Sequence, residues 1–211
     1  MGMIGHVRQI TPSELQRLQR QPETVKRFLH GKVLANAGNI RSALARVSQL
    51  ARQARSSGAT DPAEREKTRT EIIQELQSAG VKLPGEGADD EGLSLEKSWH
   101  SLHYLLTGKT EEAPPPLGNA ILGGSPLGGD LGYGPARFLS PEQVREVAAA
   151  LSEVTPQDLA QHFDLDAMSA ATVYACADED ELEMAQHYFE KLMQYYADAA
   201  AKNNAMLLWI D

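Results

Sequence analysis

The chain has 211 residues, of which 42% are hydrophobic and 23% charged, which suffices for one buried core of ordinary size. Its single cysteine, Cys176, excludes an intramolecular disulfide and any zinc site built from four cysteines, and both exclusions fit a reducing cytosol. No apolar run approaches the roughly 18 residues of a membrane-spanning helix. We therefore expect a soluble, cytoplasmic protein with no membrane partner.

Charge is distributed unevenly along the chain, whose formal net charge is −9. Residues 1–80 carry 13 Lys and Arg against 7 Asp and Glu, whereas residues 81–211 carry 7 against 22. Such asymmetry indicates either an interaction surface or two halves that dock on each other, and both interpretations are open. The basic segment 24–60 has few aromatic residues and no recognisable nucleic-acid motif. Together with the acidic net charge, this argues against a nucleic-acid partner.

In chain order, residues 3–10 predict a first strand, and a helix-start signature follows it. The signature is a capping residue, then proline, then an acidic or amide residue three positions after the cap. It occurs four times, as Thr11-Pro-Ser-Glu14, Asp61-Pro-Ala-Glu64, Ser140-Pro-Glu-Gln143 and Thr155-Pro-Gln-Asp158. The chain is therefore helix-rich, with further helical spacing over residues 40–54 and a polar, acidic linker at 84–93.

The central stretch, residues 94–139, holds the first candidate site. Ser94 is expected to cap a helix that ends at Gly108, with Leu95, Trp99, Leu102 and Leu106 as its core stripe. His100, His103 and Tyr104 share one face of this helix. A metal would need a third ligand, and acid–base catalysis a nucleophile or paired carboxylate, and neither is evident. We therefore expect no metal, no cofactor and no catalytic residue, with His103 buried and hydrogen-bonded and His100 half exposed.

A proline- and glycine-dense segment follows the helix. Residues 120–122 are expected to form a short strand, and residues 123–134 contain six glycines. Because no lysine or phosphate-loop pattern accompanies them, these glycines predict tight turns around a groove bracketed by Tyr133 and Arg137. Arg137 either grips the carboxylate or phosphate of a ligand or pairs with an internal acid, and we favour the internal pairing.

The C-terminal part predicts helices over residues 140–151 and 155–163, a turn region at 164–174, a long helix from 178 to about 202, and a buried strand at 205–210. Five carboxylates crowd the start of the long helix: Asp178, Glu179, Asp180, Glu181 and Glu183. The helix dipole stabilises carboxylates at this position, so a structural role suffices to explain them. The same cluster is also suited to binding a basic partner. Cys176 beside it is expected to be a small core residue whose pKa the acids raise, not a nucleophile.

Four runs of the sequence resemble the YfbM-like family, a family of small bacterial proteins carried as a domain of unknown function. They are MGMIG, SLEKSWHSLHYLLTG, the run from AILGGSPLG to LGYGPARFLSPEQV, and AMLLWID. The resemblance implies a compact α+β fold but no established activity and no agreed catalytic residues. We therefore predict a single α+β domain over 1–211, helix-rich, with a small mixed or antiparallel sheet that includes the N- and C-terminal strands. Residues 32–90 match poorly and are interpreted as a divergent helical elaboration.

Two functional hypotheses follow. The first is a non-catalytic cytosolic protein-binding module for a basic partner, with an immunity protein that neutralises a secreted bacterial toxin as its specific form. The second is an enzyme or a binder of small anions that uses a groove of Trp99, His100, His103, Tyr133 and Arg137. The convergence of those side chains on one pocket would discriminate between them.

Overall fold

A computed structural model describes residues 2–30, 45–48, 72, 92–176, 178 and 180–211. The chain divides into two compact units, residues 1–25 with 89–211, and residues 26–88. In the second unit, residues 26–30 and 45–48 are helical. Most of the predicted elaboration at 32–90, including the helix start at Asp61, lies outside the described residues, so the domain assignment stays a prediction.

The first unit is built on a five-stranded antiparallel sheet in the order β2-β1-β5-β4-β3. Its strands are β1 (Gly5–Ile10), β2 (Leu93–Glu96), β3 (Ser125–Asp130), β4 (Pro135–Leu139) and β5 (Ala205–Ile210). The two terminal strands pair in the middle of the sheet, with Val7 opposite Leu208. This confirms the predicted α+β fold and its sheet of N- and C-terminal strands.

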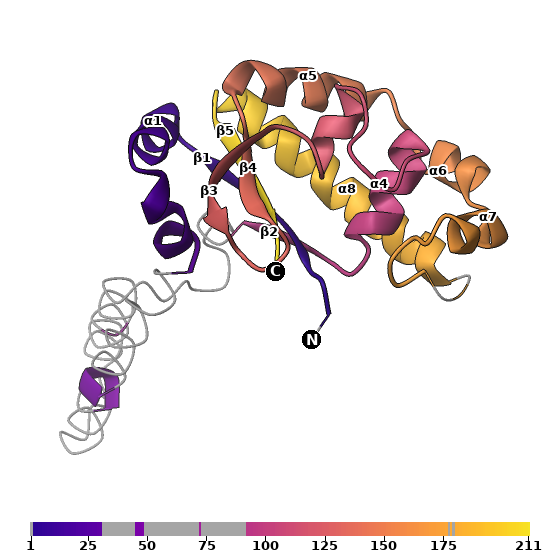
Figure 1. The fold of residues 1–211 in the computed structure, drawn as a ribbon, viewed down its shortest axis with the longest axis horizontal. Helices are drawn as coiled ribbons and strands as arrows, with labels where there is room; N and C mark the ends of the chain where they lie inside the picture. The colour runs from indigo at the N-terminus through magenta and orange to yellow at the C-terminus, as the bar shows by residue number, and fades with distance from the viewer. Residues whose placement is uncertain (1, 31–44, 49–71, 73–91, 177, 179) are drawn as a thin grey trace, which may run out of the picture. The chain divides into compact units, whose positions relative to one another are not determined.

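The helices of this unit are α1 (Pro12–Arg20), the short 3-10 helix η1 (Pro22–Thr24), α4 (Trp99–Thr107), the 3-10 helix η2 (Leu117–Ala120), α5 (Pro141–Ser152), α6 (Pro156–His162), α7 (Leu165–Ala170) and α8 (Asp180–Ala201). Of these, α5 and α8 contact the sheet, η1 contacts β3, and α4 and α6 pack against α8 (Figure 1). Thr11, Ser140 and Thr155 each close a capping box at the start of their helix, as the signature predicts. Within the described part of the chain, no helix is long and apolar enough to span a bilayer.

The main core lies between α4, α5 and α8 and one face of the sheet. Strand residues Val7, Leu139, Met206 and Leu208 are each at most 1% exposed and belong to one cluster with the buried leucines of these helices. Because side chains alternate along a strand, Leu207 and Leu127 face the other side. There β3 meets η1: a Cβ atom at Gly128 would lie 2.9 Å from the Val25 Cβ.

Four local predictions are wrong. Ser94 lies in strand β2 instead of capping a helix, because Glu96 at φ 49° turns the chain and α4 begins only at Trp99. Residues 120–122 are the end of η2 and a turn, and residues 125–130 form strand β3 instead of turns. The expected turn region at 164–174 contains α7, whose first turn is capped by the Asp164 side chain.

Candidate functional site

Helix α4 carries the two histidines that the sequence analysis singled out. It ends at Gly108, which takes the left-handed conformation at φ 68° that glycine adopts without strain. The residues that follow, which we call the α4 loop (residues 108–116), turn back along the helix. Both histidines reach this loop, so the ring nitrogens of α4 and the backbone of the α4 loop define the first part of the site.

His100 joins three segments of the chain. Its Nδ1 accepts a hydrogen bond from the Tyr174 backbone N–H at 2.9 Å, and its Nε2 lies 2.9 Å from the Thr110 carbonyl oxygen. Because a backbone N–H can only donate and a carbonyl can only accept, the ring is neutral, with its proton on Nε2. Burial lowers the pKa of His100, and the bond to Thr110 opposes this only in part. The expectation that His100 is half exposed is wrong: it is 9% exposed.

His103 lies one turn further along α4 and is fully buried, as predicted. Its Nε2 donates to the Glu111 carbonyl oxygen at 2.7 Å, while its Nδ1 is buried and has no hydrogen-bond partner in the described part of the chain. Burial lowers the pKa of His103, and the nearby His100 lowers it further against the opposing bond to Glu111. A buried, neutral histidine with one engaged nitrogen acts here as a donor to the α4 loop.

Arg137 on β4 reaches the same loop from the other side. Its Nε donates to the Gly123 carbonyl at 3.1 Å, one terminal nitrogen donates to the Gly124 carbonyl at 2.9 Å, and the other lies 2.8 Å from the Glu112 carboxylate. This is the internal pairing that the sequence analysis favoured. Three successive loop residues, Thr110 to Glu112, are thus each bound by a different candidate side chain.

Of the remaining members of the proposed groove, Tyr133 lies apart from this arrangement and Trp99 packs beside His100. Tyr133 is at the tip of the β3–β4 hairpin and is 53% exposed. Trp99 is buried, stacks on the His100 ring with centroids 4.6 Å apart, and donates from its Nε1 to the Met3 carbonyl. His100, His103 and Arg137 therefore meet at the α4 loop, where their donors are engaged by the chain's own acceptors. Within the described residues, no group of three or more His, Cys, Asp or Glu could hold a metal ion.

The acidic cluster lies at the start of α8, and Glu179 is outside the described residues. Four exposed carboxylates that we call the acidic surface lie along α7 and the start of α8: Asp166, Asp178, Asp180 and Glu183. Glu181 is half-buried, and one of its carboxylate oxygens is buried without a hydrogen-bond partner. Burial, together with Glu181 and Asp178, raises the pKa of the half-buried Cys176 thiol, as the sequence analysis expected of its acidic neighbours.

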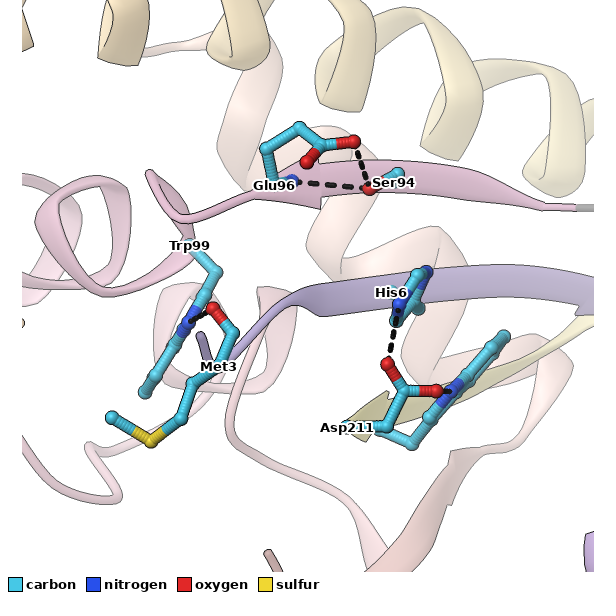
Figure 2. Close-up of polar contacts among 7 residues, drawn as sticks. Met3, His6, Ser94, Glu96, Trp99 and Asp211 are labelled. Carbon is cyan, nitrogen blue, oxygen red and sulfur yellow. Dashed lines mark hydrogen bonds and ion pairs between the residues drawn. The ribbon is translucent and has the colours of Figure 1, made fainter. Parts of the chain in front are cut away.

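A cluster that the sequence patterns do not predict forms where the first and last strands meet. His6 stacks on Trp209, its partner across the strands, and its Nε2 lies 3.0 Å from Asp211 Oδ1 (Figure 2). Trp209 Nε1 binds the other oxygen of the same carboxylate at 3.2 Å. The prediction that both terminal strands share a sheet was the available signal, but it does not fix their register.

A second missed contact holds the N-terminal segment against α4. Tyr174 Oη accepts from the Met3 N–H at 3.0 Å, and the Trp99 indole lies against the Met3 backbone (Figure 2). Gly5 is required beside them, because a Cβ there would lie 2.4 Å from the Trp99 Cβ. Met3 and Gly5 of the MGMIG run therefore have a packing role against α4.

Comparisons with known proteins agree with this fold. Among curated proteins, no match was found. A crystal structure of a protein of unknown function, YfbM from Escherichia coli, is similar with a TM-score of 0.57 and 16% sequence identity, over 99% of each chain. At that identity the similarity shows the fold alone. The family described as Domain of unknown function (DUF1877) matches residues 1–209. The chain therefore belongs to the DUF1877 family, in agreement with its resemblance to YfbM-like proteins.

Proposed function

We propose that the chain is a non-catalytic protein-binding module whose acidic surface binds a basic protein. The main support is a contrast in how polar groups are used. His100, His103 and Arg137 bind the backbone or side chains of the α4 loop and its neighbours, whereas Asp166, Asp178, Asp180 and Glu183 are exposed. None of the ion pairs between described residues involves these four carboxylates.

The sequence around the acidic surface strengthens its field. Residues 147–190 contain ten Asp and Glu and no Lys or Arg. Two of these acids have structural roles, because Asp158 completes the capping box of α6 and Asp164 caps α7. The other acids add negative potential that no Lys or Arg of the same segment offsets. A field of one sign speeds the association of an oppositely charged partner.

The acidic surface also has an apolar element. Met184, on α8 beside Glu183, is 43% exposed and is one of two large hydrophobic side chains that are exposed among the described residues. A flexible methionine among carboxylates suits a contact in which charge orients the partner and an apolar side chain is then buried. In the specific form of the proposal, the partner is a secreted bacterial toxin whose basic active site this surface occludes.

The test compares two triple variants that remove the same charge. The first, Asp178→Asn with Asp180→Asn and Glu183→Gln, neutralises the acidic surface. The control, Glu23→Gln with Glu142→Gln and Glu146→Gln, neutralises exposed acids on η1 and α5. Tagged full-length chains are used to co-purify partners from the native host, and any captured basic protein is then purified and titrated against all three chains.

We expect one basic protein whose dissociation constant rises on the order of tenfold or more for the acidic-surface variant, and little for the control. The affinity should weaken as salt is raised. Equal binding by both variants, or no reconstituted complex with any captured protein, would refute the proposal. A thermal-shift titration with inorganic phosphate tests the alternative: stabilisation of wild type that Arg137→Gln abolishes would favour a small-anion binder.

A further inference from the structure

The segment that joins α7 to α8, which we call the α7–α8 loop (residues 171–176), has an unfavourable backbone. Thr172 and Ala175 adopt φ values of 63° and 58°, in the left-handed region that residues with a Cβ rarely occupy. Each such residue is strained and persists only where its surroundings enforce it. The contacts that enforce this conformation therefore decide whether the loop keeps it.

Val173 is buried in the main core and the Tyr174 ring stacks on Trp99, while the polar contacts of the loop beyond α7 centre on Tyr174. The start of the loop is bound to α7 by the Thr172 and Val173 N–H groups, which donate to carbonyls of Ser169 and Met168. Tyr174 then binds residues outside the loop. Its hydroxyl accepts a hydrogen bond from the Met3 N–H, and its backbone N–H donates to His100 Nδ1 at 2.9 Å. Of the acceptors that hold the loop backbone, the imidazole nitrogen is the one that can itself take up a proton near neutral pH.

We propose that His100 is a pH-sensitive latch on the α7–α8 loop: protonation of its Nδ1 replaces the acceptor of the Tyr174 N–H with a second donor and releases the loop. The proton comes from solvent and leaves the Nε2–H in place. The bond to the Thr110 carbonyl therefore persists. Protonation breaks only one of the two bonds of the ring: α4 and the α4 loop stay joined, while the α7–α8 loop loses its main-chain hydrogen bond to α4.

The surroundings of His100 determine the direction of the effect. The other titratable groups on α4 are His103 and Tyr104, and His162 on α6 reaches the Leu105 carbonyl of α4. On α8, Tyr188, Tyr195 and Tyr196 pack in or against the core that α4 joins, while Asp180 and Glu183 are exposed. In the α4 loop, Lys109 and Glu111 are exposed. His100 lowers the pKa of His103, and Glu181 lies beside Cys176, where it raises the thiol pKa. Desolvation of the ring is the largest influence, so the neutral form is favoured.

The pH window follows from this sign. Burial lowers the pKa of His100 below the ordinary histidine value of about 6.5. His100 therefore binds a proton more readily when the loop is released or the chain is unfolded than when the loop is latched. The stabilisation is thus complete above about pH 6.5 and is lost as pH falls through the lowered pKa. Any effect of the released loop on the adjacent acidic surface rests on the proposed function, whereas the latch itself does not.

The experiment measures hydrogen exchange of the Tyr174 amide in the full chain, without any partner, between pH 7.5 and 5. Rates are corrected for the intrinsic pH dependence of exchange. We expect protection of this amide to fall as pH drops below about 6.5, by at most about tenfold per pH unit, and to level off below the lowered pKa of His100, while the Leu106 amide in α4 keeps its protection. In His100→Gln, whose side-chain amide can accept from Tyr174 and donate to Thr110 without titrating, protection should not change with pH.

His103→Gln is the matched control, since it removes a titrating histidine that binds the same α4 loop but not the α7–α8 loop. It should keep the pH dependence of wild type. Nitrogen-15 shifts of the His100 ring in wild type provide a measurement that needs no variant to fold. Unchanged Tyr174 protection after His100 has become protonated would overturn the latch, as would an equal pH dependence in His100→Gln. Neither result bears on whether a basic partner binds.

Discussion

Helix α4 and the start of α8 lie in the same compact unit but use their polar side chains in opposite ways. On α4, His100 and His103 are buried and bind carbonyl oxygens of the α4 loop. At the start of α8, Asp180 and Glu183 are exposed. Buried polar groups must be satisfied because an unpaired one costs about 1–3 kcal/mol, whereas exposed carboxylates are satisfied by water. The histidines of α4 therefore have structural roles, whereas the exposed carboxylates of α8 are not needed to satisfy a buried group.

The largest difference between the two helices should appear when a histidine is truncated. His103→Ala removes a fully buried ring and its bond to Glu111 and leaves a cavity, so we expect the free energy of unfolding to fall by about 2–4 kcal/mol. His187→Ala on α8 makes the same chemical change at an exposed position and should stay within about 0.5 kcal/mol. Urea denaturation of both variants measures this, and equal losses would contradict the contrast.

A smaller effect should separate the two partners of the ion pair that closes the α4 loop. Arg137→Gln removes the donors to Gly123, Gly124 and Glu112, and we expect a loss of about 1–2 kcal/mol. Glu112→Gln removes only an exposed carboxylate and should cost less than about 1 kcal/mol. If the two losses in urea denaturation match, Arg137 acts mainly through its ion pair and the carbonyl bonds contribute little.

The helix starts show what the sequence can predict. The capping signatures at Thr11, Ser140 and Thr155 are local, since cap and partner are three residues apart, and all three form. The apolar terminal strand was predicted for a similar reason, because its burial follows from composition. The same reasoning gave a wrong prediction at Ser94. Ser94 was expected to cap a helix, but it lies in β2, which pairs with β1 in the sheet.

The candidate site could be predicted only in part, because the sequence does not show which groups accept the hydrogen bonds of its histidines. His100 and His103 were found because their residue type is conspicuous, but their acceptors are backbone carbonyls, which every residue carries. The sequence therefore cannot show that these nitrogens are engaged. Arg137 differs because its partner Glu112 is itself a charged side chain, and an internal pairing could be favoured in advance.

The smallest expected effect tests whether the helix dipole alone accounts for the acidic surface. Asp180 lies in the first turn of α8, so Asp180→Asn should lower the free energy of unfolding by about 0.3–1 kcal/mol at low salt. Glu183→Gln should lower it less, because the field of the dipole decreases within one turn. Each carboxylate is also repelled by the others, and every single variant relieves its repulsions with both neighbours, so the triple variant with Asp178→Asn should lose more than the sum of the three single losses.

That excess measures the repulsion stored in the acidic surface. A stored repulsion means that the cluster is more acidic than the helix end requires, which a basic partner would relieve on binding. Thermal or urea unfolding of the three single variants and the triple variant, repeated at high salt, gives the comparison, and Glu190→Gln in the middle of α8 is the control. Strictly additive losses would instead show that the dipole stabilises every carboxylate independently, and the acidic surface would then have a sufficient structural explanation.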